Sequence, residues 1–304
     1  MTIKSSTNRP MQAIVQWRDY LELCKPKVVA LMVFTAIVGM LLADPANVDL
    51  LTLFFATVGI ALVASSAAAI NHVADSRIDA AMDRTKLRPL PSGSLDKTSV
   101  LMFAFLIGAI GMVLLIMQIN VLTAVLTFLS LVGYAVVYTM YLKRATPQNI
   151  VIGGAAGATP PLLGWTAITG TVDADALVLF LIIFTWTPPH FWALAIYRKD
   201  EYAKVDIPML PVTHGEDYTR LQITLYTVLM SLVTVLPYFT GMSGLLYLVT
   251  ALLLNAGFLY YSISLQITKS RTKAINTFVY SIVYLMALFA VLLLDRFLPY
   301  INML

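Results

Sequence analysis

The residues of this chain best suited to chemistry gather at the end of an apolar stretch. In "NHVADSRIDAAMDRTKLRPLPSG", residues 71–93, an amide and three carboxylates recur at every fourth position: Asn71, Asp75, Asp79 and Asp83. Four residues advance a helix by about 400°, so these side chains drift over only about 120° of one helical face. Carboxylate and amide oxygens suit Mg²⁺, which usually completes its coordination with water and substrate phosphate. The spacing therefore predicts a metal site built from these four residues.

A basic run follows the acids, at Arg84, Lys86 and Arg88. Cations in this position can hold the phosphate oxygens that a metal leaves free. The alternative is a solvated helix end on which acids and bases simply pair. Ionisable groups at membrane depth are costly, however, and usually face a cavity with a partner. The pattern favours a diphosphate site at the membrane surface.

The rest of the chain is apolar enough to lie in a bilayer. Of its 304 residues, 59% are hydrophobic and 12% charged, and the mean hydropathy is +0.82. A soluble domain of this size cannot bury so much apolar surface. A spanning helix needs about 20 apolar residues. We expect spans near 28–43, 51–72, 99–117, 120–141, 149–169, 176–196, 221–240, 245–265 and 276–294.

The predicted fold class is an all-α integral membrane protein with about nine transmembrane helices in one bundle. A single domain covers residues 1–304, with an N-terminal tail at about 1–27. We expect a central cavity that opens to the cytoplasmic side. Cys24 is the only cysteine, so an intramolecular disulfide is excluded.

The distribution of charge predicts the orientation. With the N-terminus inside, all of the 20 Lys and Arg residues except Arg296 fall in inner segments, whereas the outer loops carry acids such as Asp44 and Asp173. This bias predicts a multi-pass protein of a bacterial inner membrane, with a cytoplasmic N-terminus and a periplasmic C-terminus. The pI near 9 implies contact with anionic lipid or an anionic substrate, and nothing indicates nucleic acid.

Two inner loops are long and polar, at about 73–98 and about 197–220. Each carries acids and bases followed by a proline-containing turn, and they lie four helices apart, which suggests two related halves. The second loop holds Arg198, Lys199 and Asp200. Two such loops on one side of the membrane would close over a single site.

The loops resemble those of the intramembrane prenyltransferases. Residues 71–79 match the first motif, N-x-x-x-D-x-x-x-D, and "TWTPPHFWALAIYRKDEY" (185–202) with "YRKDEYAKVDIPMLPVTHG" (197–215) resembles the haem-farnesylating branch. The segments "KPKVVALMVFTAIVGMLLA" (25–43) and "GGAAGATPPLLGW" (153–165) are similar too. The chain departs from the family in the second loop, where Asp200, Glu201 and Asp206 do not form D-x-x-x-D.

This resemblance implies transfer of a farnesyl group from farnesyl diphosphate to the 2-vinyl group of haem B, with addition of water, to give haem O and diphosphate. It implies Mg²⁺ as cofactor, haem B as substrate, and haem A synthase or a terminal oxidase as partners. The residues expected in catalysis are Asp75, Asp79, Arg84, Lys86, Arg88 and Asp200. The expected metal ligands are Asn71, Asp75, Asp79, Asp83 and Asp200. The residues expected to bind substrate are Asn71, Arg198, Lys199, Tyr197, Trp192 and His190.

An allylic cation formed in this reaction needs a dry, electron-rich wall. Aromatic residues near the inner ends of the fourth and sixth expected helices are candidates for it: Tyr138, Tyr141, Trp186, Phe191, Trp192 and Tyr197. Among the three histidines, His190 follows a Pro-Pro pair inside an apolar stretch and is the favoured haem contact, ahead of His72 and His214.

Two other functions stay open. The first motif also fits a prenyltransferase for an aromatic acid or quinone precursor, which incubation with farnesyl diphosphate and either haem B or 4-hydroxybenzoate would distinguish. The second alternative is a transporter, because paired halves and proline-broken helices, expected here at Pro160–Pro161 and Pro188–Pro189, also occur there. Its ionisable groups should lie at the midplane, whereas here they gather at the inner rim.

The orientation is tested with reporter fusions at Leu304. A periplasm-dependent reporter should be active there and a cytoplasmic one silent, because positive charge stays inside. A cytoplasmic signal at Leu304 would mean that the number of spans is even.

The second loop generates another prediction, that Asp200 matters more than Asp206. Asp200 directly follows Lys199 at the end of an apolar helix, whereas Asp206 precedes Pro208 in a turned segment. An exposed pair of Asp206 with Lys204 contributes about 1 kcal/mol or less. Lost positioning of metal or diphosphate at Asp200 costs several kcal/mol, with roughly tenfold in rate for each 1.4 kcal/mol. Haem O formation by Asp200→Ala and Asp206→Ala, at matched membrane levels and titrated Mg²⁺, measures the difference, and the reverse order of activity would refute it.

Overall fold

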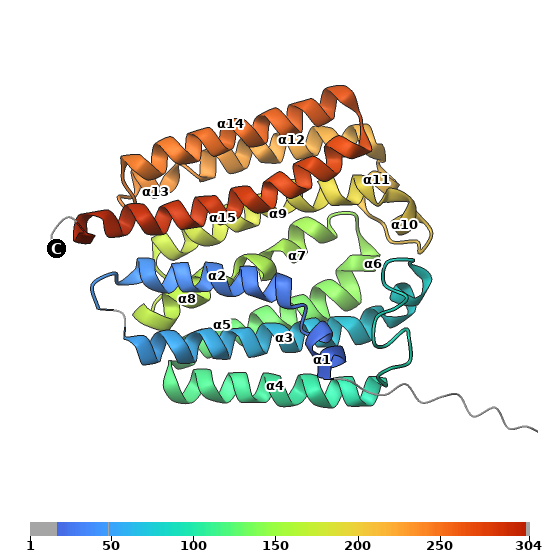
Figure 1. Cartoon of the computed structure of the whole chain (residues 1–304), viewed down its shortest axis with the longest axis horizontal. Helices are drawn as coiled ribbons and strands as arrows, with labels where there is room; N and C mark the ends of the chain where they lie inside the picture. Colours follow the sequence, from blue (N-terminus) through green and yellow to red (C-terminus); the bar gives the residue numbers. More distant parts are fainter. Residues whose placement is uncertain (1–16, 48, 302–304) are drawn as a thin grey trace, which may run out of the picture.

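The structure is a computed structural model that describes residues 17–47 and 49–301 (Figure 1). The tail before Trp17 and the reporter position Leu304 lie outside these residues. All regular structure in the described residues is helical, so the predicted all-α class is confirmed. Because several helices are long and apolar enough to cross a bilayer, the chain is a multi-pass membrane protein.

Eight helical segments in the described part of the chain have the length and hydropathy of a membrane span. Six are single helices: α2 (Pro26–Ala43), α3 (Leu50–Ala81), α4 (Lys97–Gln118), α9 (Ala174–Tyr197), α14 (Leu245–Thr268) and α15 (Arg271–Ile301). The other two are composite. One joins α5 (Val121–Val132), the π-helix η1 (Gly133–Leu142) and α6 (Lys143–Ala145), and the other joins α12 (Gly215–Val233) and α13 (Leu236–Phe239).

The expected span at 149–169 is divided into two helices, α7 (Asn149–Ala158) and α8 (Pro160–Thr169). Pro160 and Pro161 lack the backbone N–H that would continue α7, and proline is well suited to the first turn of a new helix. Each half is too short to span a membrane alone, so the number nine stays a prediction, as does the central cavity. Pro188 and Pro189 behave differently, because α9 continues through both. The expectation that they break a helix was wrong.

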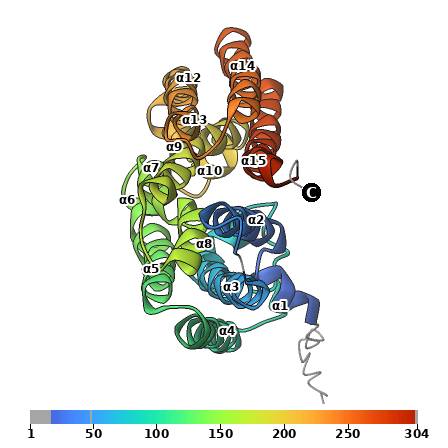
Figure 2. The ribbon, with the colours of Figure 1, turned by 90° about the vertical axis from the view of Figure 1, so that its left-hand side faces the viewer.

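The helices form two groups joined by α9 (Figure 2). In the first group α3 packs along α4, and α2 packs against α8; in the second, α9 packs against α12 and α15. The loop after α3, together with α6, α10 (Lys199–Ala203) and α11 (Leu210–Thr213), lies at one end of the bundle (Figure 1). The polar segments that the sequence places on the inner side are therefore at the same end.

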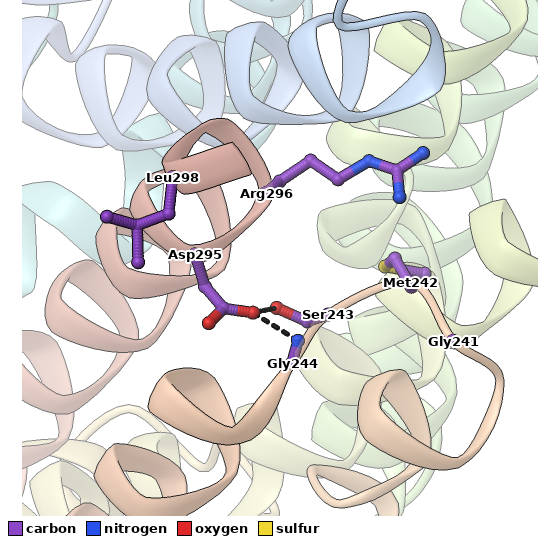
Figure 3. A pocket seen from close by; sticks show the side chains of 7 residues that line it. All are labelled: Gly241, Met242, Ser243, Gly244, Asp295, Arg296 and Leu298. Atoms are coloured by element: carbon purple, nitrogen blue, oxygen red, sulfur yellow. Dashed lines mark hydrogen bonds between the residues drawn. The ribbon is translucent and has the colours of Figure 1, made fainter. Parts of the chain in front are cut away.

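The opposite end of the bundle holds the turn before α14. There the Asp295 carboxylate accepts hydrogen bonds from Ser243 Oγ, at 2.6 Å, and from the backbone N–H of Gly244 (Figure 3). A hollow of about 540 Å³ lies beside this contact and is also lined by Arg296. Asp295 thus joins α15 to the turn before α14, at the end of the bundle away from the acids of α3.

Two glycines allow α2 and α8 to approach each other closely. A Cβ atom at Gly39 would meet the backbone carbonyl of Pro161, and one at Gly164 would meet the backbone carbonyl of Ala36. Small residues at helix contacts permit such approach in membrane proteins, where packing rather than the hydrophobic effect holds helices together. The broken α7–α8 segment is therefore held in place by backbone contact with α2.

We expect Gly164→Ala to destabilise the protein by about 1–3 kcal/mol, because its methyl group meets backbone that cannot rotate away. Gly157→Ala in α7 is the matched control, since nothing lies within 4 Å of its added Cβ. Thermal unfolding of the two variants in the same detergent measures the difference. Equal melting temperatures would show that α2 and α8 can separate without cost.

Candidate functional site

Asn71, Asp75 and Asp79 form a buried polar row, which we call the acid row, along the last turns of α3. Each residue is only 4% exposed. Their spacing of four places them on one side of the helix, where Asn71 Nδ2 donates to Asp75 Oδ2 at 2.9 Å. Asn71 Nδ2 also donates to Thr139 Oγ1 of η1 at 3.1 Å. Buried carboxylates need compensating charge, so the source of that charge decides how the site is built.

Three cations from three separate segments supply the compensation. Lys143 Nζ donates to Asp75 Oδ2 at 2.6 Å, and Arg88 Nη1 donates to Asp79 Oδ2 at 2.8 Å. Lys25 Nζ donates to the amide oxygen of Asn71. The acid row is thereby connected to the α1–α2 junction, to the first loop and to the start of α6.

Lys25 occupies an unusual backbone position between α1 (Trp17–Leu23) and α2. Its φ is 48°, and the proline that follows it disfavours the right-handed helical conformation. Burial lowers the pKa of Lys25 to about 8, and the positive charge of Arg88 adds to this effect. The ammonium group is therefore held where its charge is costly, beside the carboxylates that offset part of the cost.

Sequence reasoning did not identify Lys25, Lys143 or Thr139 as site residues. Both lysines were interpreted as part of the inner positive charge, and Lys25 also begins the segment 25–43 that resembles the family. Neither was assigned to the acid row, because each reaches it from a part of the chain distant in sequence. Thr139 lies in a π-helix, where its hydroxyl also donates to the carbonyl of Tyr134, five residues earlier. Such irregular turns are frequent at functional sites.

Asp83 does not join the acid row. Helix α3 ends at Ala81 and Met82 is extended, so the predicted helical series ends at Asp79. The side chain of Asp83 is 79% exposed and pairs with Lys86 at 2.9 Å, which lowers its pKa. The helical spacing that motivated this fourth ligand does not extend to its position.

The two long loops pack against each other, as expected. Met82 of the first loop lies in a hydrophobic cluster with Tyr202, Ile207 and Met209 of the second loop. Partial burial and the positive charges of Arg198 in the second loop and Arg88 in the first lower the pKa of Arg84. This concentration of guanidinium groups beside the acid row suits a highly charged anion.

The other predicted residues of the second loop are engaged elsewhere. Asp200 on α10 accepts two hydrogen bonds from Arg271, at 2.7 and 3.1 Å, and its side chain is 66% exposed. Arg198 pairs with Glu201 at 3.4 Å. Lys199 lies 3.5 Å from the Glu216 carboxylate. Among the described residues no three His, Cys, Asp or Glu side chains meet in a metal-binding group, so the expected set with Asp83 and Asp200 is not assembled. The importance of Asp200 for turnover stays a prediction.

The predicted aromatic residues do not form one wall. Trp192 is buried against Tyr226, whereas Tyr141 and Tyr197 are exposed. Trp186 is buried in the core between helices. Tyr138 is the candidate closest in sequence to Thr139, and its ring stacks on Tyr134 at 5.6 Å.

His190 has the contacts of a structural residue. Its ring stacks on Trp186 at 4.1 Å and on Phe278 at 4.6 Å, and Nδ1 lies 2.6 Å from Ser281 Oγ. These contacts join α9 to α15. By contrast His72, beside Asn71, is 1% exposed and neither ring nitrogen has a hydrogen-bond partner. The hydrogen bond of His190 engages Nδ1 alone, so the haem contact expected at this residue stays a prediction.

The acid row fits a divalent cation. Asp75 Oδ1 is buried and has no hydrogen-bond partner, so one carboxylate oxygen is open. Mg²⁺ is commonly held by one or two carboxylates together with water and substrate phosphate, and the row offers two carboxylates and an amide.

Comparison with known proteins agrees with this geometry. The sequence profile of the UbiA prenyltransferase family matches residues 32–294. A protoheme IX farnesyltransferase of Marinobacter nauticus is 60% identical over 283 residues, covering 93% of this chain and 94% of its own. One from Teredinibacter turnerae is 56% identical over 301 residues, covering 98% and 97%.

Solved structures share the fold at low identity. One structure, solved in work on digeranylgeranylglyceryl phosphate synthase in membranes, superimposes on this chain with a TM-score of 0.77 at 20% identity. The match covers 92% of this chain and 98% of that one. A UbiA homologue from Archaeoglobus fulgidus, bound to GPP and Mg²⁺, gives a TM-score of 0.64 at 14% identity, covering 90% and 99%. The family profile spans most of the sequence and the relatives match almost end to end, so this chain belongs to the UbiA prenyltransferase family.

Proposed function

We propose that this protein transfers the farnesyl group of farnesyl diphosphate to the 2-vinyl group of haem B, with addition of water, and releases haem O and diphosphate. The observation that carries the proposal is the buried Asn71–Asp75–Asp79 row with its three cations. The choice of farnesyl donor and haem acceptor is supported by the relatives at 56–60% identity, which carry the name protoheme IX farnesyltransferase. The protein would act in a bacterial inner membrane and supply haem A synthase or a terminal oxidase.

The acid row is placed to receive the diphosphate through Mg²⁺. Asp75 and Asp79, with Asn71, would hold the ion. Asp75 Oδ1 has no hydrogen-bond partner among the described residues and is therefore the first oxygen available as a metal ligand. When bound, Mg²⁺ neutralises the charge that builds on the departing diphosphate. The A. fulgidus homologue bound to GPP and Mg²⁺ supports this use of the fold.

The cations around the row would hold the diphosphate oxygens. Arg88 and Lys143 already touch the row, and the positive charges of Arg88 and Arg198 act on Arg84. Guanidinium groups bind phosphate through paired N–H donors, and fixed donors stabilise developing negative charge without reorganisation. Lys86 and Lys199 are paired with Asp83 and Glu216 and lie farther out.

The farnesyl cation would form beside η1. Tyr138 is adjacent to Thr139, which contacts Asn71, and Tyr138 stacks on Tyr134. The faces of these rings can stabilise positive charge at the carbon that leaves the diphosphate. A Cβ atom at Gly153 would overlap the Tyr138 ring, so the glycine leaves the ring the space it occupies.

Extraction of haem from membranes tests the proposal directly. Membranes that contain this protein should convert haem B and farnesyl diphosphate to haem O, and membranes without it should not. Prenylation of 4-hydroxybenzoate, with haem B unchanged, would instead assign the protein to a different acceptor.

Asp75→Asn and Asp79→Asn should each reduce haem O formation by on the order of 10²–10³-fold, which corresponds to several kcal/mol of barrier. Each change removes a carboxylate from the row while the amide keeps the shape of the side chain. Asp83→Asn is the matched control, because its carboxylate is exposed and outside the row. Chromatography of extracted haems, at equal protein and saturating Mg²⁺, measures the effect. Near-normal turnover of both row variants would remove the acid row from the mechanism.

A further inference from the structure

A second hollow lies beside the acid row, and we call it the α1 pocket. It has a volume of about 560 Å³ and is lined by Trp17, Arg18, Leu21 and Glu22 of α1, by the segment 25–28, and by His72 and Arg88. Sites for small molecules commonly have about 300–1,000 Å³. The volume of the α1 pocket lies within this range.

The α1 pocket shares two walls with the proposed diphosphate site. Lys25 lines the pocket and donates to Asn71, and Arg88 lines the pocket and donates to Asp79. A molecule in the pocket would consequently lie next to the acid row. This is the position that a second substrate must take for its reacting carbon to meet the farnesyl group.

The outer part of the pocket carries positive charge without a partner. Arg18 and Lys27 are both exposed, and neither forms an ion pair with any residue that the structure describes. Glu22 is the only acid among the lining residues. The Arg18 guanidinium lies 5.7 Å from the centre of the Trp17 ring, and Trp17 and Leu21 supply apolar lining from α1. The pocket therefore suits a largely apolar molecule with carboxylates at one edge.

The inner part of the pocket contains an unsatisfied group. His72 is 1% exposed, and both of its ring nitrogens lack a hydrogen-bond partner. Buried polar side chains without any partner are rare in folded proteins. The imidazole therefore forms part of the pocket wall beside Asn71, with both of its nitrogens buried.

We propose that the α1 pocket binds the porphyrin acceptor, with its two propionates paired to Arg18 and Lys27. The inference rests on the proposed function and names the site of its second substrate. Haem B carries its propionates at one edge of the ring and its vinyl groups toward the other. Propionates held at the exposed cations would therefore direct the vinyl edge inward, toward Lys25, Arg88 and the acid row.

The test compares haem B with its dimethyl ester, in which the propionates are uncharged. Affinities are measured by absorbance titration of the full-length protein in phosphatidylcholine nanodiscs, without farnesyl diphosphate. We expect the wild type to bind haem B on the order of tenfold more tightly than the ester, since charged pairs are lost in the ester. The variant Arg18→Gln/Lys27→Gln should bind both at the affinity of the ester. Lys97→Gln/Lys273→Gln removes two charges outside the pocket and should keep the full preference.

The outcomes separate this inference from the proposed function. If the Arg18→Gln/Lys27→Gln variant keeps the preference while wild-type membranes make haem O, the acceptor binds elsewhere and only the α1 pocket assignment fails. If the wild type neither binds haem B nor makes haem O, the proposed function fails. Anionic phosphatidylglycerol in the nanodiscs should not change the preference. If the preference for haem B over its ester disappears when phosphatidylglycerol is added, lipid phosphate occupies the pocket and the inference is overturned.

Discussion

The carboxylates of Asp75 and Asp79 impose the constraint on which the rest of the inner end depends. They are buried at the end of a spanning helix, where an uncompensated charge costs several kcal/mol. Lys143 and Arg88 neutralise them, and Lys25 completes the row at Asn71. The start of α2, the first loop and the start of α6 must therefore converge on α3, although they are far apart in the sequence.

This convergence explains two backbone irregularities. Lys25 adopts a left-handed conformation at the entry to α2, the position from which its side chain reaches Asn71. The chain between α5 and α6 is a π-helix, and from it Thr139 contacts the same asparagine. Both features depart from regular helix at the residues that touch the row. Irregular backbone at membrane depth is tolerated where it is buried in protein, and Thr139, which contacts the row, is fully buried.

The polar residues at the inner end fall into two groups, which differ in whether their partners are buried or exposed. The residues on the row have buried partners and an open carboxylate oxygen, whereas the pairs of Asp83 with Lys86 and of Asp200 with Arg271 lie in solvent. Exposed pairs of this kind contribute little to stability. The first and second loops are instead held together by the hydrophobic cluster around Met82 and Tyr202, which brings Arg84 toward Arg198. Apolar contact thus positions the cations, and the cations suit an anionic substrate.

The sequence alone was sufficient for the membrane class, most of the spans and the first acid motif. These depend on local properties, namely runs of apolar residues and a spacing of four along one helix, which the chain expresses within a few turns. The tertiary structure decided which residues stand beside that motif. The contacts of Lys25 and Lys143 with the row carry no local signal, because they form across the bundle. Asp83 continued the spacing of four and yet lies outside the row, because α3 ends at Ala81. The Pro-Pro pair before His190 did not indicate its neighbours, which are Trp186, Phe278 and Ser281. A side chain's neighbours depend on where helices end and how they pack, and neither is encoded in the spacing of one segment.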